Sequence, residues 1–201
     1  ITKPVNSAEI SCYDPAQVSQ PGDGYLHLRA VKRSCTANNG ITYQYASGLV
    51  ESAHDFTFTY GRMEARMWLP GSAAGGHNWP AFWADGLGKW PSTGELDVME
   101  ILSGGQPCWH FHSLDANGQH QGPGSCARMA NPSGWHTFAA EWRPGVVDFF
   151  YDGVKVGRLS QWITSSPMFL ILNLGISTEH GGDLVTPSET LVDYVRVTSL
   201  T

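Results

Sequence analysis

Hydrophobic and polar residues alternate in several short runs along the chain, and this alternation predicts β-strands. Successive side chains of a strand point to opposite faces, so a period of two marks a strand with one buried face. The clearest runs with this period are 24–30, 62–69 and 136–142. Two further runs, 146–151 and 154–159, flank Asp152-Gly153, a dipeptide typical of the turn in a β-hairpin. A β-branched run at 191–197 predicts one more strand.

Helical periodicity is nearly absent, and long segments rich in Gly, Ser, Pro and Asn separate the runs. These segments are 71–78, 102–107, 115–134 and 176–190. Many strands with long loops and no alternating helices favour two packed sheets. No low-complexity linker or fixed repeat divides the 201 residues, a length that suits one substantial domain. We therefore expect an all-β sandwich that forms a single domain over residues 1–201.

Composition and charge narrow the classes of function. Charged residues make up 15% of the chain, the formal net charge is -6, and the 12 Lys and Arg are scattered. Nucleic-acid binding needs clustered positive charge, so we expect none, and a polyanionic glycan is disfavoured for the same reason. The longest apolar run, 168–172, is too short to cross a bilayer, so we expect no membrane contact. The eight Trp must fill a large core or line an exposed groove.

The four cysteines favour disulfide bonds over a metal site. Cys12, Cys35, Cys108 and Cys126 show no C-x-x-C pair and no His at zinc-finger spacing. The simplest pairs are the neighbours in sequence, Cys12 with Cys35 and Cys108 with Cys126, and both imply an oxidising compartment. No signal peptide is present, so we expect the mature part of a secreted protein. The alternative is four buried thiols in a cytosolic protein.

Three carboxyl groups lie close together in the segment Glu95-Leu96-Asp97-Val98-Met99-Glu100. In a strand Glu95 and Asp97 share a face, but strict alternation would place Met99 there and turn Glu100 away. One extra residue in a β-bulge returns Glu100 to the acidic face. Three acids on one face repel one another, and proteins tolerate this mainly where the repulsion separates pKa values. An acidic strand that faces solvent or binds a cation is the alternative.

Glycoside hydrolysis is the reaction that uses such a cluster. Retaining cleavage needs a nucleophilic carboxylate and a protonated carboxyl about 5–5.5 Å apart across the scissile bond. Two glutamates that lean toward one another along a bulged strand can reach that separation. Asp97 between them can form a hydrogen bond with the nucleophile, and its negative charge can raise the pKa of the acid.

Tryptophans and histidines flank the acids in the sequence. Trp79 and Trp90 precede the acids, and Trp109, His110 and His112 follow them. Indole rings stack on the apolar C–H faces of sugars, whose hydroxyl groups need polar partners. We therefore assign these three tryptophans to a substrate groove. Three others are expected mostly in the core: Trp83, Trp135 and Trp142.

These motifs resemble glycoside hydrolase family 16, whose signature is E-x-D-x-x-E in its bulged form. Other blocks resemble the family in its order, from about residue 45 onward: 58–66 its YGRxEAR strand, 79–83 its WPAFW, 169–174 its FLILNL strand and 192–197 its closing strand. The first forty or so residues match only loosely. The resemblance implies a concanavalin A-like jelly-roll sandwich of two curved antiparallel sheets, with the acids on the floor of a concave substrate cleft.

The resemblance also implies roles for individual residues. Glu95 corresponds to the nucleophile, Glu100 to the general acid/base and Asp97 to the assisting acid. His110 or His112 is expected near the acid/base, and Asn173 is expected to face the cleft from a neighbouring strand.

No cofactor is implied by the resemblance. Some relatives bind a structural calcium ion on the convex face through an acid like Asp193. We assign neither calcium nor another metal to this chain.

The position of Met99 narrows the substrate. The bulged form is typical of family members that act on β-1,3-glucans, agars, carrageenans and galactans, and the acidic chain disfavours sulfated carrageenan. Residues 79–100 look most like laminarinases, although Leu49 stands where many of these carry Arg. We expect a secreted, monomeric, endo-acting retaining β-glycanase on polysaccharide or oligosaccharide, foremost an endo-β-1,3-glucanase. The alternatives are another β-glycan (mixed-linkage glucan, agar or galactan), transglycosylation, or a non-catalytic glycan-binding protein on the same fold.

Overall fold

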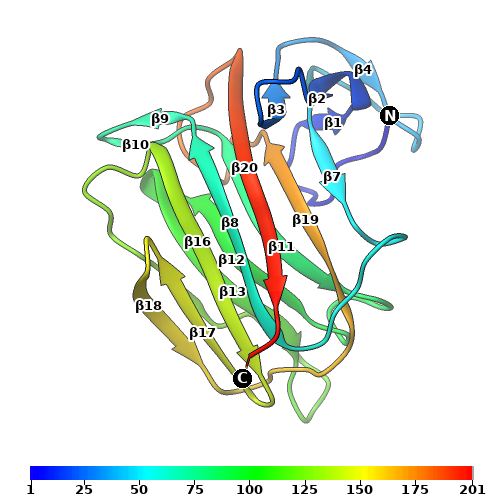
Figure 1. Ribbon diagram of the computed structural model, residues 1–201. Helices are drawn as coiled ribbons and strands as arrows, with labels where there is room; N and C mark the ends of the chain where they lie inside the picture. Colours follow the sequence, from blue (N-terminus) through cyan, green and yellow to red (C-terminus); the bar gives the residue numbers. More distant parts are fainter. Residues whose placement is uncertain (201) are drawn as a thin grey trace.

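Two seven-stranded β-sheets lie face to face in the computed structural model, which describes residues 1–200 (Figure 1). Sheet 1 has the order β14-β13-β12-β11-β19-β7, with β15 paired to β13. Its strands are β7 (Leu49–Glu51), β11 (Trp79–Gly86), β12 (Glu95–Leu102), β13 (Gln106–Leu114), β14 (His120–Gln121), β15 (Gly124–Cys126) and β19 (Met168–Gly175). Neighbouring strands of this sheet run antiparallel.

Sheet 2 has the order β18-β17-β16-β8-β20-β3-β2 and is also antiparallel. Its strands are β2 (Val18–Ser19), β3 (Leu26–Ala30), β8 (Gly61–Leu69), β16 (Gly134–Arg143), β17 (Val146–Tyr151), β18 (Val154–Leu159) and β20 (Ser188–Thr198). In Figure 1 β16, β8 and β20 lie in front of the strands of sheet 1. The predicted all-β jelly-roll sandwich is confirmed.

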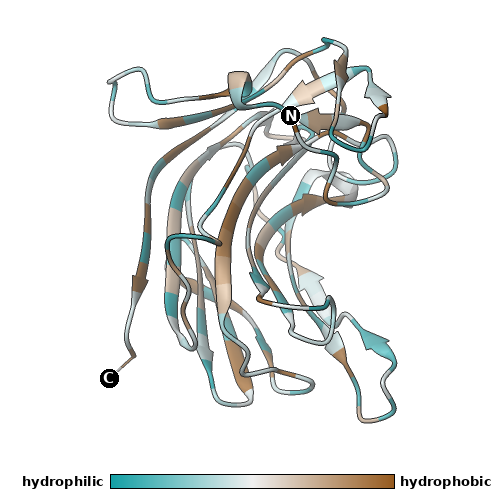
Figure 2. Cartoon of the chain, turned by 90° about the vertical axis from the view of Figure 1, so that its right-hand side faces the viewer, coloured by the Kyte–Doolittle hydropathy of each residue, from teal (hydrophilic) through white to brown (hydrophobic). Residues whose placement is uncertain are grey.

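The core lies between the sheets and follows the predicted alternation. On β8 the residues at 63, 65, 67 and 69 are fully buried, and on β16 Phe138, Ala140 and Trp142 are. Phe82 and Phe111 of sheet 1 belong to the same cluster. Figure 2 shows the resulting bands of hydrophobic residues along the strands. Burying a side chain of this size contributes about 1.5–3 kcal/mol, so the facing apolar stripes hold the two sheets together.

The predicted hairpin and strands appear at nearly the expected residues. β17 and β18 have the predicted bounds and turn at Asp152 and Gly153, both with positive φ. The long loops contain short strands that alternation did not predict, because two- or three-residue strands carry too few side chains for a period. Within 71–78 these are β9 (Gly71–Ser72) and β10 (Gly75–Gly76), and within 115–134 they are β14 and β15.

The remaining small elements gather mainly at the end of the sandwich near the N-terminus (Figure 1). β1 (Ser11–Tyr13) pairs in parallel with β6 (Tyr45–Ser47), and β4 (Cys35–Thr36) pairs with β5 (Thr42–Tyr43). Within residues 1–200, helical structure is limited to the 3-10 turns η1 (Pro15–Gln17) and η2 (Ser103–Gly105). Among the described residues no helix is long and apolar enough to cross a membrane.

Two disulfides join the pairs of cysteines that the sequence suggested. Cys12 is bonded to Cys35, and Cys108 is bonded to Cys126. The second bond fastens the edge strand β15 to β13, where Cys108 also faces Glu100 of β12 across the sheet. The disulfide therefore braces the strand beside the acidic cluster.

Removing the second disulfide is expected to destabilise the fold. The bond closes a loop with a sequence separation of 18 residues, and a loop of that size contributes about 3 kcal/mol by restricting the unfolded chain. Urea unfolding of the Cys108→Ser/Cys126→Ser double variant should show a loss of that order. Ser125→Ala, a change at an exposed neighbour of Cys126, is the control and should unfold like wild type. An unchanged unfolding midpoint in the double variant would contradict the stabilising role.

Candidate active site

A β-bulge in β12 brings the three acids to one face. Asp97 pairs with Trp83 of β11 and Met99 pairs with Phe82, so Val98 is the extra residue. Val98 and Met99 are both fully buried in the core, and Glu100 returns to the face of Glu95 and Asp97. The predicted bulge is confirmed, and it lets two consecutive side chains pack inward without displacing an acid.

A tyrosine from sheet 2 supports the bulge from behind. A bulge interrupts the ladder of backbone hydrogen bonds, and the β12–β13 register shifts between Asp97 and Glu100. The buried hydroxyl of Tyr151 lies 3.1 Å from the Val98 carbonyl oxygen and 2.9 Å from that of Cys108, and it donates to them. Sheet 2 thus fixes the backbone that carries the acids.

The cleft above the acids has a volume of about 810 Å³. Its lining comes from β11, β12, β13 and β19, together with residues 5–9 and the loop at His180. Of the residues assigned from the sequence, those that line it are Trp79, Trp90, Glu95, Asp97, Glu100, His110, His112 and Asn173.

Glu95 and Glu100 are each held by an indole N–H. Trp90 Nε1 donates to Glu95 Oε2 at 2.6 Å, and Trp79 Nε1 donates to Glu100 Oε2 at 2.9 Å. His110 Nδ1 lies 2.8 Å from the other carboxylate oxygen of Glu100. One oxygen of Glu95 therefore remains without a bond from the described residues, whereas both oxygens of Glu100 are engaged.

Asp97 lies between the two glutamates and is the most buried of the three acids. One oxygen of Asp97 lies within 4.8 Å of an oxygen of Glu95, and one lies within the same distance of an oxygen of Glu100. Its Oδ2 is buried without a hydrogen-bond partner among the described residues; His112 Nε2 is nearby, at 3.4 Å. His112 is not a cation there, since burial and the neighbouring His110 lower its pKa to about 4.

Burial and mutual repulsion raise the pKa values of the cluster. Burial, helped by the charges of Asp85 and Glu100, raises the pKa of Glu95 to about 7, against the lowering effect of the Trp90 hydrogen bond. Burial and the charges of Glu95, Glu100 and Asp85 raise the pKa of Asp97 well above its usual range. Burial raises the pKa of Asp85, which faces Glu95 across the strands, to about 6. The cluster therefore retains protons at neutral pH.

The same acids with His110 or His112 have the donor types of a divalent-metal site. The indole N–H groups of Trp79 and Trp90 already donate to two of these carboxylates. On the other face of the sandwich, Arg66 Nη1 donates a hydrogen bond to Asp193 Oδ2 at 2.7 Å.

A second hydrogen-bonded chain crosses the cleft floor at Asn173. Trp83 Nε1 donates to Asn173 Oδ1 at 2.8 Å, and Asn173 Nδ2 donates to the Tyr13 hydroxyl at 2.8 Å. The Tyr13 hydroxyl in turn donates to Glu9, which ties the N-terminal segment to sheet 1. Asn173 lies in the cleft as expected, but its partners came from segments that the sequence did not connect with the site.

Three tryptophans lie differently from the prediction, and one of them is Trp135, which was expected mostly in the core but is only half-buried on the outer face of sheet 2. Trp109 was assigned to the groove, but it is 7% exposed, belongs to the core and stacks on Phe149 at 4.7 Å. The period of two explains this, because His110 and His112 of the same strand face the cleft and Trp109 must face the core. Trp83, assigned mostly to the core, is equally buried but lines the cleft.

Alternation would have found Trp83, since it shares a strand face with Trp79. Other cleft residues were missed because only the folded chain brings them near. His120 lies 3.0 Å from His112 and packs against Trp90, and His180 packs edge-on against Trp79. His120 belongs to the two-residue strand β14 and His180 to a loop, and neither lies in a motif.

Comparison with known proteins decides the family. The model for glycosyl hydrolases family 16 matches residues 12–196. The chain belongs to glycosyl hydrolases family 16. The resemblance noted in the sequence is therefore confirmed.

Two curated relatives in family 16 are similar over most of the chain. It is 31% identical to endo-1,3-1,4-β-glycanase EglC of Rhizobium meliloti (strain 1021), over 94% of this chain and 42% of that protein. It is 29% identical to a keratan-sulfate endo-1,4-β-galactosidase of Sphingobacterium multivorum, over 92% of this chain and 47% of that protein. The chain thus spans less than half the length of these two relatives.

Among solved structures of similar fold is LamA from Z. galactanivorans in complex with laminaritriose and laminaritetraose. It superimposes with a TM-score of 0.81 and 29% identity, over 98% of this chain and 89% of that chain.

Replacing Glu95 with Gln is expected to stabilise the protein at alkaline pH. The pKa of Glu95 rises from 4.5 to about 7 on folding, so the folded state binds more protons than the unfolded state between these values. Stability then falls as pH rises through this window and stays lower above it. Glu95→Gln removes this penalty, on the order of 3 kcal/mol at most.

Chemical unfolding at pH 4 and pH 8 checks this expectation. The Gln variant should exceed wild type clearly at pH 8 and by little at pH 4. The exposed Glu51→Gln is the matched control and should show no such pH-dependent gain. An equal effect of Glu95→Gln at both pH values would contradict the raised pKa.

Proposed function

We propose that residues 1–201 form the catalytic domain of a secreted retaining endo-β-glycan hydrolase, and that its main substrate is a β-1,3-glucan. The observation that carries the proposal is the arrangement of β12. Two glutamates, each held by an indole N–H, flank a buried aspartate on the floor of a cleft. Retaining glycosidases need two carboxyls, one as nucleophile and one as general acid/base, on either side of the scissile bond.

Glu95 is the proposed nucleophile. The indole of Trp90 fixes Oε2, which leaves Oε1 free to attack the anomeric carbon of the sugar above it. In the first step the C1–O bond to the departing sugar breaks as the C1–O bond to Glu95 forms. Formation of this ester removes the charge of Glu95, which relieves its repulsion with Asp85 and Glu100.

Glu100 is the proposed general acid/base. Its carboxyl gives a proton to the glycosidic oxygen of the leaving sugar, and it then takes one from the water that hydrolyses the ester. Trp79 and His110 hold the carboxyl in one orientation through both steps. Water attacks from the side that the leaving sugar vacates, so the product keeps the β configuration.

Asp97 is the proposed positioning acid. Its raised pKa keeps a proton on it while Glu95 is ionised, since three charges at this spacing would repel one another strongly. Its Oδ2 is buried without a hydrogen-bond partner among the described residues, and a proton on this atom leaves it uncharged.

Relatives support the choice of sugar. The EglC glycanase is named for 1,3-1,4 linkages, and LamA was solved with laminarin oligosaccharides. Leu49, which packs against Trp83 and Ile171, departs from the Arg that many laminarinases carry at this position. The galactosidase relative keeps a β-galactan as the second candidate.

Secretion and a monomeric state belong to the same proposal. The two disulfides favour an oxidising compartment. Residues of one chain line the cleft and supply both glutamates, so a second subunit is not needed for catalysis.

A panel of glycans tests the reaction and the sugar together. Laminarin should be cleaved faster than mixed-linkage glucan, agarose or β-1,3-galactan, with short oligosaccharides as early products. NMR of the first product should show the β-anomer. Initial α-anomer would contradict the retaining mechanism, and no cleavage of any glycan would contradict the enzyme function.

Trp90→Phe is expected to move the acidic limb of the pH–rate profile. The hydrogen bond from Trp90 lowers the pKa of Glu95, so its loss should raise that pKa, and the limb of kcat/KM should shift upward by roughly 1 unit. Trp162→Phe, at an exposed Trp outside the cleft, is the control and should leave the limb in place. An unshifted limb in Trp90→Phe would contradict the role of Glu95 as the ionised nucleophile.

A further inference from the structure

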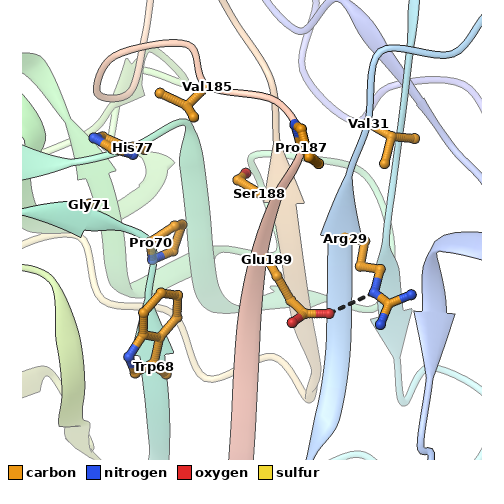
Figure 3. A pocket seen from close by; sticks show the side chains of 10 residues that line it. All are labelled: Arg29, Val31, Trp68, Pro70, Gly71, His77, Val185, Pro187, Ser188 and Glu189. Carbon is orange, nitrogen blue, oxygen red and sulfur yellow. Dashed lines mark hydrogen bonds and ion pairs between the residues drawn. The ribbon is translucent and has the colours of Figure 1, made fainter.

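A second pocket lies outside the catalytic cleft, where β3, β8 and the loop before β20 meet (Figure 3). Its volume is about 450 Å³, within the range of small-molecule sites in proteins. It shares no lining residue with the cleft. The lining residues used below are Arg29, Trp68, Pro70, Val185, Ser188 and Glu189.

An indole forms part of this pocket and faces away from the core. Met67 and Leu69 are fully buried between the sheets, so Trp68 between them points to the outer surface of sheet 2. The indole is half-buried, and its N–H is not among the buried groups that lack a partner. Trp135 lies opposite Trp68 on β16, and its ring packs at a tilt against that of Tyr25, with 5.0 Å between the ring centroids. The outer face therefore carries a band of aromatic rings that begins in the pocket.

The pocket also contains polar side chains next to the indole, and Arg29 and Glu189 among them form an ion pair whose charges cancel. Arg29 Nε donates to Glu189 Oε1 at 2.7 Å, as Figure 3 shows, and His27 Nδ1 lies 2.9 Å from the same oxygen. Among the described residues no partner accepts from the two terminal NH₂ groups of Arg29, whose side chain is 53% exposed. The terminal N–H groups of Arg29 are thus available to a ligand, while the charge of Arg29 is balanced by Glu189.

The wall of the pocket is fixed in place from behind by Asn78. Its buried side chain donates to the Val185 carbonyl at 2.8 Å and to Ser188 Oγ at 2.5 Å, and it accepts from the Val185 N–H at 3.1 Å. Since Ser188 Oγ accepts from Asn78, its own hydroxyl proton can be donated into the pocket. A ligand here would not have to order this loop, which lowers the entropic cost of binding.

We propose that this pocket is a second, non-catalytic binding site for a neutral β-glycan. Sugar rings need an apolar surface for their C–H faces and donors and acceptors for their hydroxyls. Trp68 and Pro70 supply the first, and Arg29, Ser188 and Glu189 supply the second. The neutralised ion pair and the net charge of -6 disfavour a polyanion. The sugar class rests on the proposed function.

A site on the outer face of sheet 2 serves polysaccharide and not short oligosaccharide. The cleft lies on sheet 1, and the pocket lies on the opposite sheet, over β8, β20 and β3. A short product cannot occupy both, whereas a long chain or a particle offers many segments. Holding one segment raises the local concentration of others near the cleft. Trp68 should therefore matter for polymeric substrate and not for the chemical step.

Calorimetric titration tests the second site directly. Glu95→Gln, in which hydrolysis is blocked, should bind two molecules of laminarihexaose, and Glu95→Gln/Trp68→Ala should bind one. In the otherwise wild-type chain, Trp68→Ala should weaken retention in laminarin-containing gels about tenfold, equivalent to about 1.4 kcal/mol. Its kcat/KM on laminarihexaose should stay within about twofold of the wild-type value, a much smaller change than the tenfold loss of retention. Trp162→Ala is the matched control for loss of an exposed indole and should behave like wild type in both assays.

The outcomes separate this proposal from the proposed function. Cleavage of laminarin together with one binding site in Glu95→Gln would overturn the second site alone. Equal losses on polymer and hexasaccharide in Trp68→Ala would also overturn it. If Trp68→Ala does not fold, Trp68→Arg replaces it, because the apolar stem of Arg covers the same surface. In either case, the number of laminarihexaose molecules that Glu95→Gln binds tests the second site. If another glycan of the panel is the substrate, its oligosaccharide replaces laminarihexaose.

Discussion

The site depends on a single irregularity in β12. The extra residue at Val98 lets Val98 and Met99 both enter the core while Glu95, Asp97 and Glu100 remain on the cleft face. A regular strand would have turned Glu100 into the core and Met99 into the cleft. The packing between the sheets and the placement of the acids therefore depend on the same bulge. Tyr151 of sheet 2 holds the bulged backbone in place through the Val98 and Cys108 carbonyls.

Electrostatics follow from that placement. Burial in the cleft floor and the charges of neighbouring carboxylates oppose ionisation, so the pKa values of Glu95 and Asp97 rise. The indole N–H of Trp90 then favours the charged form of Glu95, and the indole N–H of Trp79 donates to Glu100. The balance leaves a set of acids that exchanges charge near neutral pH, as general acid–base catalysis requires. This arrangement lowers the stability of the fold at high pH in favour of reactivity.

Local patterns in the sequence were sufficient for the sandwich, the bulge and the acids. The alternation in β8 and β16 and the turn at Asp152-Gly153 are properties of neighbouring residues. The same rule, applied to β13, would have placed Trp109 in the core, because His110 and His112 claim the other face. That error came from reading a tryptophan by its chemistry before its strand position.

The remaining cleft residues depend on contacts between distant segments. Glu9 and Tyr13 reach Asn173 across more than half the chain, His120 comes from the short edge strand β14, and His180 comes from a loop. No period or spacing encodes these approaches, because they result from how the sheets pack and how the loops close over them. The same holds for the outer pocket, where Asn78 joins the loop before β20 to β11.

The identity of the nucleophile is tested most directly by trapping the glycosyl-enzyme. A 2-deoxy-2-fluoro laminari-oligosaccharide with a good leaving group should label the chain once and inactivate it as turnover of the ester slows. Peptide fragmentation by mass spectrometry should place the added mass on Glu95. The Glu95→Gln variant should remain unlabelled. Label on Glu100, on Asp97 or on no residue, in an enzyme that still cleaves the substrate, would contradict the account.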